Sequence, residues 1–130
     1  MGLQQLLRVW NSSRGGAYTM KIEIQNYDDV TVVELHGEFI AEFIKPFQDT
    51  TSSVAAAGTT GIVIDMTNVG FIDGQSLEQL LWLQDYCRQN NRQLKIAGLD
   101  ENCTKIFEIT RLESQLDTYN EVSEAVKSFV

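Results

Sequence analysis

The residues best placed to do chemistry lie at the entrance to an apolar helical stretch, in the segment NVGFIDGQSLEQLLWL (68–83). Four small or polar residues separate a polar turn from leucines at helical spacing: Asp73, Gly74, Gln75 and Ser76. The first turn of a helix presents free N–H groups and a partial positive charge, so it favours a phosphate. A phosphorylated hydroxyl there would add about −1.5 to −2 of charge and could switch a docking surface. The alternative is a plain helix start, with Asp73 as the N-cap and Ser76 as a small polar residue without a chemical role.

Motifs for catalysis are missing from the sequence, which contains no P-loop, GxSxG, HExxH or dinucleotide-binding pattern. Asp65 and Asp73 flank the predicted turn and could in principle bind Mg²⁺. We favour the alternative, in which Asp65 accepts hydrogen bonds from backbone amides after a strand and Asp73 caps a helix. His36 is the single histidine and has neither a nucleophile partner nor a second ligand at metal spacing. We therefore expect no metal, no cofactor and no enzymatic activity.

The charge of the chain is strongly acidic. The net charge is −8 over 130 residues, and all 18 acidic residues lie after residue 19. Such a domain repels nucleic acid and anionic lipid, so neither is expected as a partner. The charge suits a basic protein partner, although it also fits a surface that only confers solubility.

The cysteine pattern and the hydropathy indicate a cytoplasmic protein. Cys87 and Cys103 do not form a CxxC pair, so we expect two reduced structural thiols. No apolar run reaches the roughly 18 residues that a membrane span needs.

Residues 1–19 form an N-terminal extension that precedes a single domain over residues 20–130. The extension is expected to be flexible or to form a short amphipathic helix, because residues 3–10 carry apolar side chains at helical spacing: Leu3, Leu6, Leu7 and Trp10. This cluster could also mediate self-association. NSSRGG (11–16) is typical of a linker.

The hydrophobic periodicity of residues 20–130 predicts an α/β domain. KIEIQ (21–25) and VTVVELHG (30–37) flank a polar turn and indicate a β-hairpin, and GIVIDM (61–66) and QLKIAGL (93–99) indicate buried strands. A first helix is predicted from Lys45 to Gly58, and a second from the end of the segment 68–83 to about Gln89, with Leu80 and Leu81 in the core. A third follows an Asp100 cap and has Ile106, Phe107 and Ile109 as its apolar residues. A fourth is predicted from Thr118 to Val130 with an Asn120 cap. The expected fold is a mixed four- to five-stranded sheet that begins with a hairpin, with about four helices packed mainly on one face.

The segment GIVIDMTNVGFIDGQSLEQLL (61–81) resembles the signature of the STAS domain family, the sulphate-transporter and anti-sigma-factor-antagonist fold. The usual signature is a strand that ends in Asp-Leu-Ser, a short turn, and Phe-Ile-Asp-Ser-Ser-Gly-Leu at the start of a helix. Thr67 stands in for the Ser of Asp-Leu-Ser. Five other positions agree with the pattern: Asp65, Phe71, Ile72, Asp73 and Leu77. The resemblance extends over roughly Lys21 to Val130 and includes ELHGEF (34–39) and the order of the elements.

The resemblance implies an anti-sigma factor antagonist. Most stand-alone domains of this kind bind a serine-kinase anti-sigma factor. The kinase breaks the complex by phosphorylating the first Ser of Phe-Ile-Asp-Ser-Ser-Gly-Leu. That position is Gly74, which has no hydroxyl, while Gln75 and Ser76 replace the next Ser and the Gly. Ser76 and Thr67 are alternative phosphoacceptors, although Ser76 would point about 200° away from residue 74 on an ideal helix.

The predicted function is therefore a non-catalytic module for signalling and transcription regulation, with an anti-sigma or kinase-like protein as its partner. The predicted contact region is the loop and helix start at residues 67–77, with Thr67, Asn68, Asp73, Gly74, Gln75, Ser76 and Leu77 as its residues. The resemblance leaves open an alternative, in which the chain is the STAS subunit of a lipid-transport ABC system and docks on its ATPase. An enzyme or a nucleotide-binding protein is a third hypothesis, which the absence of catalytic motifs disfavours.

Overall fold

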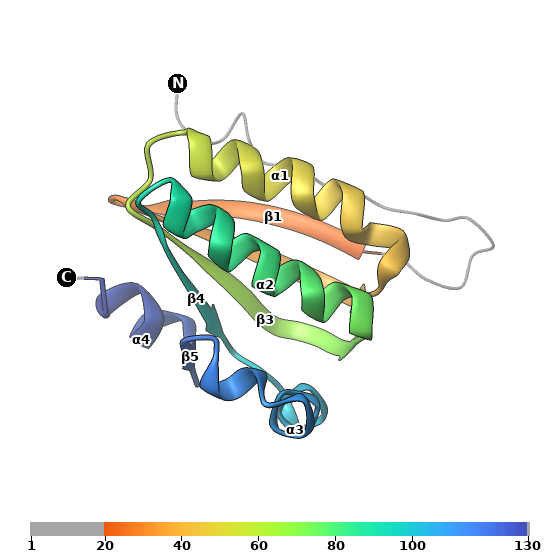
Figure 1. The fold of residues 1–130 in the computed structure, drawn as a ribbon. Coiled ribbons are helices and arrows are strands. Elements are labelled where there is room, and N and C mark those ends of the chain that lie inside the picture. Colours follow the sequence, from red (N-terminus) through yellow and green to blue (C-terminus); the bar gives the residue numbers. More distant parts are fainter. Residues whose placement is uncertain (1–19, 130) are drawn as a thin grey trace.

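A five-stranded mixed sheet forms the centre of the molecule in the computed structural model, which describes residues 20–129 (Figure 1). The strands lie in chain order: β1 (Met20–Tyr27), β2 (Val30–Phe39), β3 (Gly61–Ile72), β4 (Gln93–Ala97) and β5 (Thr118–Tyr119). β1 and β2 pair antiparallel, and every later neighbour pairs parallel. The prediction of a mixed sheet that begins with a hairpin is confirmed. The predictions for residues 1–19, including self-association through residues 3–10, lie outside the described residues.

Helices cover the two faces of the sheet unequally. The helical elements are a 3-10 turn, η3 (Ala41–Phe43), then α1 (Ile44–Ala56), α2 (Gly74–Gln89), α3 (Glu101–Thr110), a second turn, η4 (Leu112–Ser114), and α4 (Val122–Lys127). Side chains of α1, α2 and α3 join one large core on one face. The side chains of α4 join a smaller cluster on the other face. The prediction that the helices pack mainly on one face is therefore confirmed. Among residues 20–129, no helix is long and apolar enough to cross a membrane.

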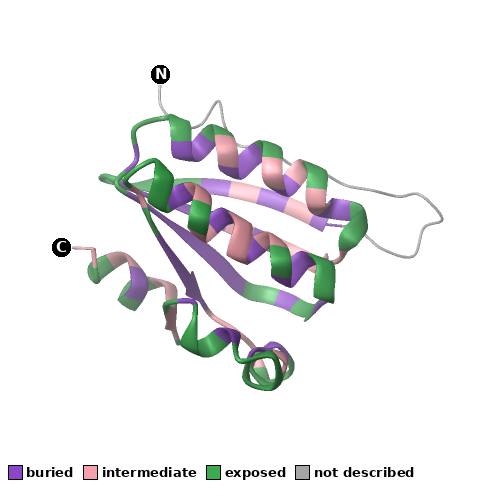
Figure 2. Cartoon of the chain, viewed as in Figure 1, coloured by how far each residue is buried: buried purple, intermediate pink, exposed green. Residues whose placement is uncertain are grey.

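The alternating sequences of β1 and β2 separate the two faces. Ile22 and Leu35 are paired across the two strands and point into the large core. Their neighbours along each strand, Glu23 and Glu34, lie on the opposite face of the sheet. Figure 2 shows the result, with buried positions on the sides of α1 and α2 that face the sheet. Leu80 of α2 is fully buried, as predicted, but Leu81 is only partly buried at the edge of the core.

β3 is twice as long as the GIVIDM strand, which corrects the predicted turn after Met66. Two register irregularities against β2 let the strand continue, one between Glu34 and His36 of β2 and one between Gly37 and Glu38. Each inserts an extra β3 residue, so the core-facing positions fall every third residue, at Met66, Val69 and Ile72. Because the period of two is lost, the segment lacks the pattern of a strand in the sequence.

The C-terminal segment also differs from its prediction, which placed one helix from Thr118 to Val130. Thr118 and Tyr119 instead form β5, because Gly98 of the β4 end donates its N–H to the Tyr119 carbonyl at 3.1 Å. α4 begins at Val122 with Glu121 at the N-cap position and no side-chain cap, so the predicted Asn120 cap is wrong.

α3 has its predicted Asp100 cap, whose side chain accepts from the Cys103 N–H at 2.7 Å. Ile109, however, is 81% exposed. It lies about 200° around the helix from Phe107, which faces the core, so the two cannot share a buried face.

Candidate functional site

The predicted partner-binding residues lie where β3 ends and α2 begins, here called the β3–α2 junction (residues 67–77). The part predicted as a loop is the end of β3, which runs to Ile72, whereas the predicted helix start is confirmed, because α2 begins at Gly74. The structure divides the predicted set by burial. Thr67, Asn68, Gly74 and Gln75 are exposed, and Asp73 is half-buried. Ser76 and Leu77 are buried in the first turn of α2, so their side chains do not lie on the surface.

Asp73 fixes the geometry of the junction. Its Oδ1 accepts from the Ser76 N–H at 2.9 Å, which confirms the predicted N-cap, and its Oδ2 accepts from the Ala41 N–H at 2.8 Å. Its own N–H donates to the Phe39 carbonyl at 3.1 Å. One residue therefore holds the start of α2 against the end of β2 and the turn η3.

Asp65 has the local role that was favoured over a metal role. Its Oδ1 accepts from the Thr67 N–H at 2.9 Å and from the Thr67 hydroxyl at 2.5 Å. These bonds fix the backbone at the first β3 bulge. With Asp73 engaged by two backbone N–H groups, both carboxylates are used to shape the junction.

Gly74 occupies the first position of α2 without a structural need for glycine. Its φ lies outside the left-handed region, and an added Cβ would meet no heavy atom within 4 Å. The position is exposed and follows the N-cap directly. A serine would therefore fit here, so the missing hydroxyl does not follow from backbone strain or lack of space.

The two alternative phosphoacceptors differ in access. The Ser76 Oγ is buried and has no hydrogen-bond partner, so a kinase could reach it only if the first turn of α2 opened. Thr67 is exposed at the end of the sheet, with its hydroxyl donated to Asp65.

Three residues in or beside the junction were not among the predicted partner-binding residues. Phe71 is 41% exposed although it is a large apolar side chain, and its position in the motif was the available signal. Asn102 of α3 donates its Nδ2 to the Gly70 carbonyl at 3.0 Å, which braces the second bulge. Gly98 has φ +78°, and an added Cβ would overlap the Thr67 side chain. The last two contacts join segments about 30 residues apart, so no local pattern could reveal them.

Both cysteines are free and buried, as predicted. Burial raises the pKa of Cys87 to about 11, and burial with the nearby Asp100 carboxylate raises the pKa of Cys103 to about 12. The Cys103 thiol contacts the Val69 carbonyl at 3.5 Å beneath the junction. Protonated thiols of this kind are structural and weakly nucleophilic.

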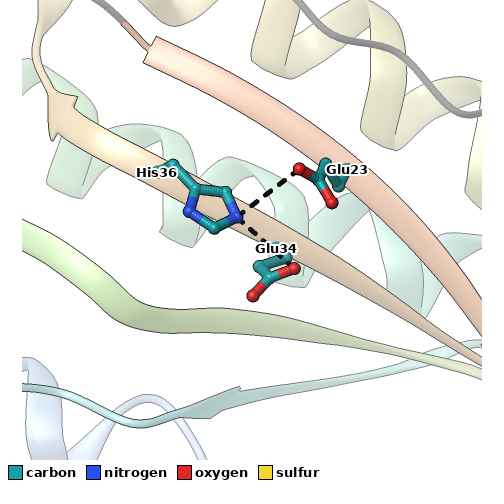
Figure 3. A group of neighbouring side chains, drawn as sticks. All are labelled: Glu23, Glu34 and His36. Atoms are coloured by element: carbon teal, nitrogen blue, oxygen red, sulfur yellow. Dashed lines mark ion pairs between the residues drawn. The ribbon is translucent and has the colours of Figure 1, made fainter.

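The prediction that His36 has no second ligand at metal spacing is wrong, because two carboxylates lie beside it. Nε2 of His36 lies 3.4 Å from Oε1 of Glu34 and 3.9 Å from Oε1 of Glu23, on the face of the sheet opposite α1 and α2 (Figure 3). The sequence spacing hides this group because Glu23 belongs to the neighbouring strand.

Comparison with known proteins places this architecture in a family. The STAS domain model matches residues 21–125, so the chain belongs to the STAS domain family. It is similar to the anti-sigma-B factor antagonist of Staphylococcus epidermidis, with 25% identity over 94 residues, which cover 72% of this chain and 87% of that protein.

Solved structures share the fold at lower identity. An anti-sigma factor antagonist from Mycobacterium paratuberculosis superposes with a TM-score of 0.77 and 17% identity, covering 84% of this chain and 92% of that one. The Bacillus cell fate determinant SpoIIAA in its phosphorylated form has a TM-score of 0.64 and 14% identity, covering 84% and 99%. The fold is therefore that of the anti-sigma factor antagonists.

Proposed function

We propose that this chain is a non-catalytic regulatory module that binds an anti-sigma factor of the serine-kinase type through the exposed part of the β3–α2 junction. The observation that carries the proposal is the helix start that Asp73 caps, with Gly74 and Gln75 exposed to solvent, within a chain similar to anti-sigma-B factor antagonists. Asp73 and Asp65 use their carboxylates to hold backbone, so they shape the surface and are not available for catalysis.

The contact surface consists of the exposed members of the predicted set together with Phe71. Thr67, Asn68, Gly74 and Gln75 supply small or polar contacts, and Phe71 supplies an aromatic anchor of the kind that is enriched in protein interfaces. The net charge of −8 favours a partner with a basic surface and would speed their association at low ionic strength. Ser76 and Leu77 support this surface from below.

We expect that binding of the partner is not switched off by phosphorylation at position 74. SpoIIAA, which shares the fold, exists in a phosphorylated form. At Gly74 this chain has no hydroxyl, so a kinase partner cannot detach it by modifying that residue. The lipid-transport alternative has no support from any feature of residues 20–129.

The test is affinity capture from an extract of the source organism with the full chain as bait. Two variants carry the same substitution at opposite ends of α2: Gln75→Arg in its first turn and Gln89→Arg at its last residue, both at exposed positions. The proposal predicts that the wild type and Gln89→Arg capture a protein with a serine-kinase ATP-binding domain, and that Gln75→Arg loses it. Capture of no such protein, or equal capture by Gln75→Arg, would contradict the proposal.

A further inference from the structure

We propose that Glu23, Glu34 and His36 form a binding site for a divalent transition-metal ion such as Zn²⁺. The site is independent of the partner surface, because it lies on the hairpin β1–β2 and uses none of the residues of the β3–α2 junction. Carboxylate oxygens and imidazole nitrogens are both zinc ligands, and open zinc sites have three protein ligands with the fourth position left for water.

The register of the hairpin brings the three side chains together. Glu23 and Glu34 are directly paired across β1 and β2, and His36 follows Glu34 by two residues, so all three point from the same face of the sheet. Figure 3 shows the imidazole directed toward both carboxylates. The site therefore stands on two paired strands, which hold ligands more rigidly than a loop does.

The distances between the ligand atoms suit a single small cation. One ligand atom from each residue lies within 4.8 Å of the other two. A zinc ion with bonds of about 2.0 to 2.2 Å in tetrahedral geometry needs its ligands roughly 3.3 to 3.5 Å apart. The contact between His36 and Glu34, at 3.4 Å, already meets this spacing, whereas the one between His36 and Glu23 is 3.9 Å. Binding of an ion therefore requires side-chain rotations that draw the three ligand atoms, now spread over up to 4.8 Å, closer together.

A second observation concerns the environment of His36 Nε2. This nitrogen is shielded from solvent and has no hydrogen-bond partner, although both carboxylates are near it. A buried polar atom without a partner is unusual in native proteins and calls for an explanation such as an ion. An imidazole protonated on Nδ1 would direct its Nε2 lone pair at two negative carboxylates, and one protonated on Nε2 could donate to only one of them. A bound cation satisfies all three groups together.

The site is partly exposed to solvent, and Lys21 competes with a metal ion for one of its ligands. The side chains of His36, Glu23 and Glu34 retain 30%, 25% and 22% exposure, so an ion can approach them from solvent, although the shielded Nε2 becomes accessible only when these side chains rotate. Lys21 Nζ lies 2.7 Å from Oε1 of Glu23 and competes with a metal for that oxygen. Its own side chain is 43% exposed, so it can move into solvent when an ion binds.

The chain offers few competing ligands for a transition metal. His36 is the only histidine of the sequence, and both cysteines are buried with protonated thiols. Exposed carboxylates elsewhere would take Mg²⁺ and Ca²⁺ about as readily as Zn²⁺, since these hard ions prefer oxygen. Zinc selectivity over magnesium is therefore a signature of the His36 site.

The experiment is a titration of the untagged full chain with ZnCl₂, followed by NMR of the imidazole signals and by calorimetry. Because the chain has a single histidine, its ring signals report on this site without further assignment. The proposal predicts one zinc per chain, a shift of the ring signals that is complete at equimolar zinc, and no such shift with MgCl₂. Ring signals that stay unmoved while zinc binds would overturn it, because the ion would then sit only on surface carboxylates.

Variants separate the site from a merely structural ion pair. Loss of even an outer partner of a metal ligand costs roughly 10–100-fold in affinity, so His36→Gln and Glu34→Gln should each weaken zinc binding at least that much. Lys21→Met should strengthen binding, because it removes the competitor for Glu23. Unchanged zinc affinity in His36→Gln, or weaker binding in a folded Lys21→Met variant, would overturn the proposal.

Discussion

Replacement of Asp73 by alanine should destabilise the domain more than its position near the surface suggests. The side chain accepts two backbone hydrogen bonds, at 2.9 Å from Ser76 and at 2.8 Å from Ala41. Loss of an N-cap costs about 0.5–2 kcal/mol, and loss of a further hydrogen bond to a charged group costs about 1.5–3 kcal/mol. Ala41 is exposed, so water can replace its partner and the second cost falls to the low end. The expected loss in free energy of unfolding is about 2–3 kcal/mol.

Asp73→Asn separates the two bonds. An asparagine retains one acceptor oxygen for the cap, but its amide group would face the other N–H as a second donor. The expected loss is therefore about half of that for alanine, roughly 1–1.5 kcal/mol, since one of the two bonds remains.

Urea denaturation followed by circular dichroism measures these changes. With a slope of about 1–3 kcal/mol per molar urea, Asp73→Ala should lower the midpoint by roughly 0.7–3 M at an unchanged slope. Ser76→Ala is the control in the same turn: its Oγ has no partner, so this variant should stay within about 0.5 kcal/mol of wild type. A midpoint for Asp73→Ala within error of wild type would refute the role of Asp73 in joining α2 to β2.

Three further predictions concern the core, the helix start and the thiols. Leu80→Ala should cost about 2–5 kcal/mol in urea denaturation, because Leu80 is fully buried in the main core, and a cost below that range would place it at the periphery. Gly74→Ser should leave the domain as stable or up to about 0.5 kcal/mol more stable, because the added side chain meets no atom and serine is the better helix former. Cys87 and Cys103 should resist a thiol reagent at pH 8 in the native state and react once the chain is unfolded. Folding raises both pKa values from 9.0, to about 11 for Cys87 and about 12 for Cys103, so the unfolded thiols ionise first. The free energy of unfolding should therefore fall as the pH rises above about 9. A free energy of unfolding that does not change between pH 8 and pH 11 would contradict this.

Local patterns in the sequence predicted the parts of the fold that local interactions decide. The hairpin, the buried strand GIVIDM and the caps at Asp73 and Asp100 were all foreseen, since each depends on residues that are close in the chain. The family signature then indicated where the site lies.

The remaining features depend on pairing between distant segments. The second half of β3 was predicted as a turn because two bulges replace its period of two by a period of three. β5 has only two residues and forms through its bonds to β4, so the pattern of α4 masked it. The neighbours Glu23 and His36 come together only through the hairpin register, which the sequence did not define to the residue.

Native mass spectrometry of the full chain with its captured kinase-type partner and ATP tests the central claim most directly, because one spectrum reports both the complex and the number of phosphates. The proposed function predicts that the wild type remains in the complex and gains no phosphate, whereas Gly74→Ser gains one and dissociates. A phosphate on the wild-type chain, at Thr67, Ser76 or elsewhere, accompanied by loss of the complex would contradict a module that phosphorylation does not switch.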